Sequence, residues 1–507
     1  MSEGRMVKAT RNVTVNVLRQ VILLLLSLFS RNVFIWGFGV GYLGMNSLFA
    51  DVLSLLSMAD LGFNTALSYS FYKPLADGDD ARIAQLTWFY RRVYRMIALA
   101  ILGIGLAIIP ILPRLINLEQ PVDHLTLYYL LSLTSVVFSY LCVYKTTILS
   151  ADQKSYLTAG ISIAVSVSKT VLQCITILLW RNYILYLTLE TAAVIVNNLV
   201  ASRAAEHQYP AICRPDRLPK EDQREIFVNL GSVFIYKLSS VLLNATDNIL
   251  ISVLVGTVSV GLYSNYLALQ NKVTAFYTLF FSAVTASIGN LIASEKAEKR
   301  YEVFHCEQTV GFIVSGIVVP LYVLLADDFI GIWLGQEFVM GMALSCAIGL
   351  NMYLSSVLSP LWSFRDATGL YRQTKWIMLL CAFLNLLLSV LLGLKYGVVG
   401  IIAASGLSRL ATYVLVEPRL LFREYFERSA VSFYRDMILN TILIVALTAA
   451  IALLWRGFDV VNLQQWLFKA MVSGCICVAA IMLAYRRRDG VRLLENYIRD
   501  FTGRHKK

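Results

Sequence analysis

The feature that most constrains the fold is a series of long apolar stretches that runs from one end of the chain to the other. A helix needs about twenty mainly apolar residues to cross the hydrocarbon core of a bilayer. Fourteen stretches meet this requirement, so the expected fold class is all-α, a polytopic membrane protein with about 14 transmembrane helices. The predicted spans cover residues 13–38, 42–71, 88–112, 124–147, 156–179, 182–202, 225–254, 259–292, 304–325, 339–363, 375–394, 397–417, 436–455 and 463–485.

The composition agrees with this interpretation and excludes a nucleic-acid-binding protein. Of the 507 residues, 58% are hydrophobic and 15% are charged, which is far from the balance of a soluble domain. The net charge of +12 arises from basic residues between apolar stretches. A nucleic-acid-binding protein would instead gather them on a folded polar domain. We therefore expect membrane lipid, and no nucleic acid, around the chain.

The distribution of lysine and arginine predicts the orientation of the spans. Basic residues accumulate in loops that stay in the cytoplasm. With the N-terminus placed inside, the predicted cytoplasmic segments hold 28 of the 44 Lys and Arg residues, the external loops hold 4 and the spans hold 12, five of them towards the cytoplasmic ends. An error in the span count would disrupt this alternation. The sequence therefore predicts that both termini are cytoplasmic and that the first helix is not a cleaved signal peptide.

Cysteine and histidine give no sign of a metal site or of catalysis. The eight cysteines fall mostly within apolar stretches, where cysteine behaves as a small hydrophobe. The four histidines are scattered, without the spacing of a zinc or catalytic motif. The external loops are short, which leaves no room for an extracellular catalytic domain. We expect no metal, no cofactor and no enzymatic activity.

Weak internal similarity indicates a chain built from two related halves. Residues 47–55 align with 261–269 at an offset of 214, and 32–35 align with 248–251 at an offset of 216. Repeated halves of this kind are common in transporters. The expected organisation is two pseudo-symmetric six-helix lobes, over 1–222 with a polar cytoplasmic linker and over 223–428, followed by two further helices and a basic tail over 429–507.

Cations inside the predicted spans are the main candidates for a binding site. Charged residues within a bilayer are costly and usually mark a function, and cations suit an anion such as a phosphate. The candidate substrate-binding residues are Arg31, Lys237, Lys272, Arg409 and Lys169. For Arg19 and Lys469 we prefer the alternative that the side chain extends to the membrane interface.

Four carboxylates in the spans are candidates for ion coupling or for structural ion pairs. They are Asp60, Asp247, Asp51 and Glu190. Asp60 is favoured over Asp51 because Ser57 and Asn64 extend its polar helix face. Glu190 could instead neutralise Lys169, and Asp247 could pair with Lys237 or Arg31. A Na⁺ or H⁺ coupling ion is therefore left open.

Two stretches identify a family resemblance. The runs YLGMNSLFADVLSLLSMADLGFNTALSYSFYKPLA and TDNILISVLVGTVSVGLYSNYLALQ resemble the polysaccharide transporter branch of the multidrug/oligosaccharidyl-lipid/polysaccharide (MOP) exporter superfamily. The chain looks like a Wzx-type flippase of lipid-linked oligosaccharides. The resemblance is strongest over residues 31–95 and 225–295.

The resemblance implies two six-helix lobes around a central cavity, working by alternating access. The implied substrate is an undecaprenyl-pyrophosphate-linked repeat unit for capsule, O-antigen or a related surface polysaccharide, moved across the bacterial cytoplasmic (inner) membrane. A polysaccharide polymerase and other export components are the implied partners. A lipid II flippase and a multidrug exporter of the same superfamily are the nearest alternatives. A membrane polymerase or ligase is less favoured because it needs a larger external loop.

Overall fold

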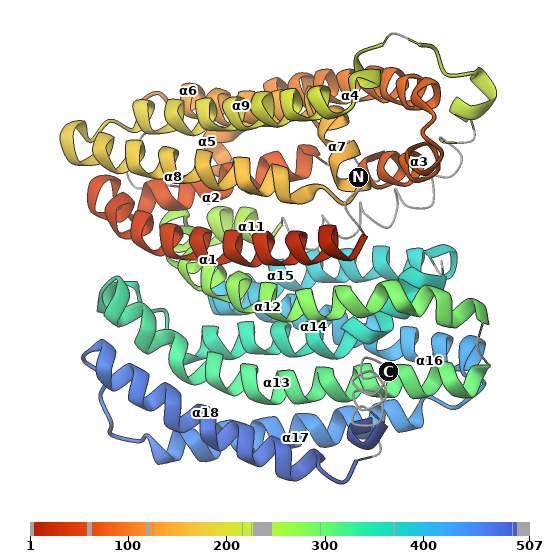
Figure 1. The fold of residues 1–507 in the computed structure, drawn as a ribbon. Helices are drawn as coiled ribbons and strands as arrows, with labels where there is room; N and C mark the ends of the chain where they lie inside the picture. Colours follow the sequence, from red (N-terminus) through yellow and green to blue (C-terminus); the bar gives the residue numbers. More distant parts are fainter. Residues whose placement is uncertain are drawn as a thin grey trace. The chain divides into compact units, whose positions relative to one another are not determined.

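A computed structural model describes most of the chain as helices joined by short connections (Figure 1). The described residues are 5–57, 63–117, 122–214, 216–224, 226, 246–294, 296–368, 371–488 and 490–493, and they contain no strand. The chain divides into two compact units, Met1–Gly261 and Leu262–Lys507. The predicted lobe boundary at residue 222 stays a prediction.

The first unit is built from helices that pack both on sequence neighbours and on helices far apart in the sequence. Figure 1 shows α4, α6 and α9 side by side, and α8 lies against both α1 and α9. The elements are α1 (Arg5–Phe38), α2 (Val40–Leu56), α3 (Phe63–Asp77), α4 (Asp80–Ile108), η2 (Ile109–Ile111), α5 (Leu112–Leu115), α6 (Leu125–Tyr140), α7 (Val143–Ala151), α8 (Ser155–Trp180), α9 (Tyr183–Gln208), η3 (Pro210–Cys213), α11 (Asp247–Leu254) and the start of α12 (Thr257–Ser294).

The second unit is organised around α13, which lies against α14, α17 and α18 (Figure 1). It contains the remainder of α12, α13 (Ala297–Trp333), η4 (Gln336–Phe338), α14 (Met342–Thr368), α15 (Tyr371–Ala411), α16 (Tyr413–Tyr425), α17 (Val431–Leu454) and α18 (Leu463–Tyr485). Five phenylalanines form its aromatic core, with ring centroids 5.1–6.5 Å apart: Phe304, Phe364, Phe422, Phe426 and Phe433.

The helices confirm the predicted all-α, polytopic membrane fold. In the described part, nine helices are long and apolar enough to cross a membrane, or up to ten if one bent pair forms a single span. Many large apolar side chains point outward, for example Leu99 at 67% and Leu179 at 66% exposure. A soluble protein would bury such a surface, whereas lipid solvates it.

One helix break falls where the sequence predicts a connection, and a second interrupts a span that the sequence predicts as continuous. Gly397 has φ +58° within α15 and separates the predicted spans 375–394 and 397–417. Glycine tolerates this left-handed conformation because it has no Cβ. The predicted span 124–147 consists of α6 and α7, which meet at an angle of 51°.

The polar segment after α9 is tied to the first unit by side chains of α4. Arg82 Nη1 lies 2.6 Å from Asp222 Oδ2, and Gln85 Nε2 donates to Asp216 Oδ2 at 3.3 Å. Nearby, the Tyr209 hydroxyl donates to Asp152 Oδ2 at 2.5 Å, and burial together with this carboxylate raises the pKa of Tyr209. This predicted cytoplasmic face is therefore held by polar contacts.

Candidate functional site

A cluster of polar side chains lies where α1, α8 and α9 pack together. The Nζ of Lys169 lies 2.9 Å from Oε1 of Glu190. Gln173, one helical turn from Lys169, donates its Nε2 to the other carboxylate oxygen of Glu190 at 2.9 Å. Glu190 thus neutralises Lys169, which is the structural alternative that the sequence left open.

Arg31 is placed on the α1 side of the same interface. Its half-buried guanidinium interacts electrostatically with Tyr186 of α9. One turn further along α1, the Phe34 ring lies 5.1 Å from the Tyr186 ring, which fixes α1 against α9. Arg31 and the Lys169–Glu190 pair therefore gather at one three-helix interface of the first unit.

The second unit holds two candidate cations that no carboxylate in the described part neutralises. Lys272 on α12 is half-buried and has neither a hydrogen bond nor an ion pair with another described residue. Arg409 on α15 donates from Nη1 to the Ser355 hydroxyl at 3.2 Å. A buried cation without a counter-charge is costly, so both positions can attract an anion.

Of the candidate carboxylates, Asp51 has a partner that the sequence did not indicate. Where α11 packs on α2, the Asn248 side chain lies beside the Asp51 carboxyl. Asn248 is 3% exposed. Asp247 begins α11. Lys237 and Asp60 lie outside the described residues, so their predicted roles stay predictions.

The α11–α12 connection is fixed to the segment after α5 by a small network of hydrogen bonds, in which Ser252 and Thr257 are buried and Asn117 is exposed. The Thr257 hydroxyl accepts from the Asn117 amide at 2.9 Å, and the Thr257 amide donates to the Asn117 carbonyl at 2.9 Å. Ser252 donates to the Leu115 carbonyl at 2.6 Å and shares a hydrogen bond with the Thr257 hydroxyl at 2.7 Å. We call these four residues the Asn117–Thr257 clamp. They lie at the predicted external ends of their helices.

Two glycines allow the helices beside this clamp to approach closely. A Cβ on Gly44 of α2 would lie 2.0 Å from the Thr257 carbonyl oxygen, and a Cβ on Gly261 would lie 2.2 Å from the Val40 carbonyl oxygen. Any larger residue would therefore push α2 away from the start of α12. The clamp and this crossing hold the start of α12 tightly against the first unit.

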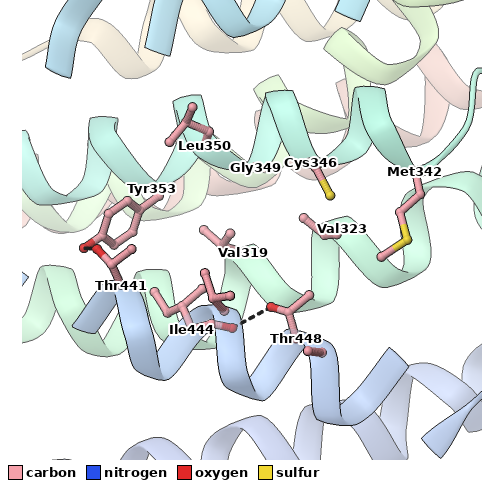
Figure 2. Close-up of a pocket in the computed structure, with 12 residues that line it drawn as sticks. Val319, Val323, Met342, Cys346, Gly349, Leu350, Tyr353, Thr441, Ile444 and Thr448 are labelled. Atoms are coloured by element: carbon pink, nitrogen blue, oxygen red, sulfur yellow. Dashed lines mark hydrogen bonds between the residues drawn. The ribbon is translucent and has the colours of Figure 1, made fainter. Parts of the chain in front are cut away.

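An apolar pocket opens in the second unit between α13, α14 and α17 (Figure 2). Its volume is about 340 Å³. Val319 and Val323 of α13 face Cys346 and Gly349 of α14. The Thr448 hydroxyl at its edge donates to the Ile444 carbonyl at 2.7 Å, within its own helix. The pocket suits a hydrocarbon chain.

Sequence analysis missed several acidic residues inside predicted spans, of which two are the most deeply buried in the described part. Glu417 on α16 pairs with Arg365 on α14, with 2.9 Å between Oε1 and Nη1 and with both side chains at most 5% exposed. Glu307 on α13 is 4% exposed, and neither of its carboxylate oxygens has a partner among the described residues. Both residues could have been found from the sequence, because a carboxylate within a predicted span, here 397–417 and 304–325, is itself unusual.

The structure offers no place for a metal in its described part. No group of three or more His, Cys, Asp or Glu side chains in the described ranges could hold one.

Comparison with known proteins places this architecture in a class. The sequence matches no protein-family model and no curated protein. The structure is similar to one described as lipid II flippase MurJ in an inward closed conformation, with a TM-score of 0.68 and 14% identity over 94% of this chain and 98% of that chain. The chain thus has the fold of the MOP-superfamily membrane transporters.

Multidrug transporters of that superfamily show the same fold. An inward-facing MATE family transporter has a TM-score of 0.59 and 12% identity, over 78% of this chain and 93% of that chain. A variant of the Vibrio cholerae MATE transporter VcmN has a TM-score of 0.57 and 16% identity, over 83% and 98%. At these identities the likeness establishes the fold alone.

Proposed function

We propose that this protein is a flippase that moves an undecaprenyl-pyrophosphate-linked oligosaccharide repeat unit across the bacterial cytoplasmic membrane by alternating access. The observation that carries the proposal is the set of cations within the membrane helices. Lys272 and Arg409 have no carboxylate partner among the described residues, and Arg31 lies at the three-helix interface of the first unit. Cations placed in this way favour a phosphate-bearing substrate over a cationic drug.

The apolar pocket supports a lipid-linked substrate. Its lining side chains, among them Val319, Val323 and Ile444, offer an isoprenoid chain an apolar surface that needs little desolvation of polar groups. A substrate with a pyrophosphate head and a polyprenyl tail would use both the cations and an apolar surface. A soluble sugar nucleotide has no apolar tail, so it would not use the apolar surface.

A lipid II flippase is the second candidate. It is favoured by the MurJ structure, which aligns with almost the whole chain. Lipid II also carries a pyrophosphate on a polyprenyl chain, so the cations and the pocket fit it equally well. The two candidates differ in the glycan and are separated by direct competition between substrates.

A multidrug exporter is the third candidate, because MATE transporters have the same fold. It is less favoured, since a site for organic cations should be acidic. In the first unit Glu190 is already engaged by Lys169 and Gln173.

A polymerase or ligase is disfavoured because the structural neighbours are transporters. Polymerase and other export components remain proposed partners.

Reconstitution in liposomes tests the proposal. Purified protein is incorporated with a fluorescent lipid-linked oligosaccharide, and a membrane-impermeant quencher reports transfer between leaflets. We expect transfer of the fluorescent substrate between leaflets. Unlabelled lipid-linked oligosaccharide should slow this transfer more than an equimolar amount of lipid II does. Stronger competition by lipid II would establish the second candidate. Export of an organic cation without any lipid transfer would refute the flippase function.

A further inference from the structure

Glu307 on α13 stands apart from the other buried acids in the described part. Its side chain is 4% exposed, and neither Oε1 nor Oε2 has a hydrogen-bond partner among the described residues. On the same helix, Phe304 packs on Phe364 of α14, and the Gly311 carbonyl accepts from Ser356 of α14. Glu307 lies between these two contacts, within the packed interior of the second unit.

Other buried acids of this unit show what a satisfied carboxylate looks like. Glu417 pairs with Arg365 at 2.9 Å. Asp327 accepts from the Tyr266 hydroxyl at 2.6 Å and from the Ser345 hydroxyl at 3.1 Å. The missing partners of Glu307 are therefore particular to this position.

Charged side chains of the helices packed on α13 are engaged elsewhere. Arg365 of α14 binds Glu417, and Lys469 of α18 binds Asp328 at 2.7 Å. Asp436 of α17 accepts from Arg435 and from Arg488. On α13 itself, the nearest charged pair is Lys299 with Glu302, and His305 stacks on Tyr301. The segment after α18 also packs on α13, where Cys306 Sγ donates to the Gly490 carbonyl at 3.8 Å, and its Arg492 is exposed. No described element around Glu307 therefore supplies it with a partner.

An ionised carboxylate in this position would be highly unfavourable. Transfer of an unpaired charge to a low-dielectric interior costs far more than folding can offset, so such a group becomes neutral instead. Sodium fits this position less well, because hard cations require several oxygen ligands, and Glu307 belongs to no cluster of three or more His, Cys, Asp or Glu side chains in the described part. The ligand that fits is a proton.

We propose that Glu307 is a proton-binding site of the second unit, occupied in this conformation and emptied when the transporter changes conformation. The second half of this statement rests on the proposed transport function, whereas the first does not. Glu307 lies ten residues beyond the start of α13 at Ala297, about 15 Å along the helix axis. That start is on the predicted cytoplasmic side, which places the site near the cytoplasm.

The direction of the pH dependence follows from linkage. The structure holds Glu307 neutral, so lower pH favours this conformation. Higher pH favours any conformation in which the carboxylate meets water or a cation. In a Glu307→Gln protein the side chain at this position stays neutral at every pH. The conformational equilibrium should therefore lose this pH dependence. Glu302→Gln is the matched control, because Glu302 is partly exposed on the same helix and paired with Lys299.

Infrared spectroscopy of the purified protein tests proton binding without any transport assay. At neutral pH, the difference between wild type and Glu307→Gln should contain the carbonyl band of a protonated carboxylic acid. The difference between wild type and Glu302→Gln should lack it. A Glu307→Gln difference that contains ionised carboxylate bands instead would overturn the proposal.

A second measurement on wild-type protein covers the case in which Glu307→Gln does not fold. Dicyclohexylcarbodiimide reacts with protonated carboxyl groups in apolar surroundings, and peptide mass spectrometry locates the adduct. We expect modification at Glu307 that decreases at least tenfold as the pH is raised, and none at Glu302. Modification that does not depend on pH would contradict a titrating site.

Transport by proteoliposomes tests the coupling. Wild-type leaflet transfer should change with pH, and Glu307→Gln should flatten that profile while Glu302→Gln keeps it. If Glu307 is protonated but Glu307→Gln leaves the pH profile of transport unchanged, Glu307 binds a proton without coupling it to transport. Absence of transfer in wild type would refute the flippase function and leave the infrared result standing.

Discussion

Asn117 and Thr257 are joined by two hydrogen bonds of 2.9 Å, although 140 residues of sequence separate them. The Asn117 amide donates to the Thr257 hydroxyl, and the Thr257 amide donates to the Asn117 carbonyl. Thr257 is fully buried. A pair of this kind fixes the start of α12 more firmly than apolar contact alone, because an unmade buried hydrogen bond is expensive.

Thr257→Val should weaken this clamp. Valine keeps the shape of threonine but leaves the partly buried Asn117 amide without its acceptor, so we expect a loss of about 0.5–1.5 kcal/mol in the free energy of unfolding. Hydrogen exchange at the Asn117 amide should become faster. Thr134→Val is the control, since the exposed Thr134 hydroxyl bonds only within its own helix. Equal effects of both variants would contradict a special role for the clamp.

Gly44→Ala should destabilise the same region by overpacking. The added methyl would lie 2.0 Å from the Thr257 carbonyl oxygen, so we expect a loss of about 1–3 kcal/mol, measured by thermal unfolding in detergent. A Cβ added to Gly103 of α4 would meet no atom within 4 Å, so Gly103→Ala should be neutral or slightly stabilising. An unchanged melting temperature for Gly44→Ala would show that α2 and α12 can separate freely.

The Lys169–Glu190 pair predicts that charge balance matters more at this position than the cation itself. Lys169→Met should impair transport because Glu190 is left unpaired, and adding Glu190→Gln should restore most of it. In thermal unfolding, we expect a coupling of about 0.5–1 kcal/mol between the two substitutions, since both side chains are partly exposed. If the double variant were as inactive as Lys169→Met, Lys169 would be a binding residue after all.

Substitution of the other cations tests anion binding. Lys272→Ala and Arg409→Ala should each reduce leaflet transfer at least tenfold, about 1.4 kcal/mol, while membrane insertion stays intact. Lys272→Arg should remain active because a mobile diphosphate needs charge more than fork geometry. Lys395→Ala, at an exposed position, is the control. Normal transfer by both alanine variants would exclude a cationic site in this unit.

Cysteine labelling tests the predicted orientation. Cys213 is exposed and lies in the predicted cytoplasmic linker, so an impermeant maleimide should modify it in inside-out vesicles alone. Cys213→Ser is the control for labelling elsewhere. A cysteine introduced by Gln336→Cys, in the predicted external loop, should react from the opposite side. Labelling of Cys213 in intact cells would show that the predicted orientation is wrong.

Much of the fold could be read from the sequence because the bilayer imposes local rules. Every span must be apolar along its own length and must satisfy its own backbone hydrogen bonds, so spans such as 156–179 and 463–485 coincide closely with α8 (Ser155–Trp180) and α18 (Leu463–Tyr485). The break between spans 375–394 and 397–417 was likewise predicted, and the structure has Gly397 in a non-helical conformation at this point.

The sites were less predictable, since they depend on which helices meet. The sequence analysis favoured Asp60 over Asp51 because it considered only the polar face of their own helix. The side chain beside Asp51, Asn248, comes from α11. Lys469 was expected to extend to the interface, and the structure pairs it with Asp328 of α13 at 2.7 Å. Glu307 was overlooked, and its importance follows from the absence of any partner around it in the described part.

The sequence by itself determined that this protein crosses the membrane many times, and it located many of the charged residues within the spans. Hydropathy and loop charge are properties of contiguous residues, so the order of the chain contains them. The tertiary structure alone decided which charges are neutralised. Lys169 meets Glu190, whereas Glu307 meets no counter-charge in the described ranges. That difference is set by side-chain distances between helices, which no local pattern encodes.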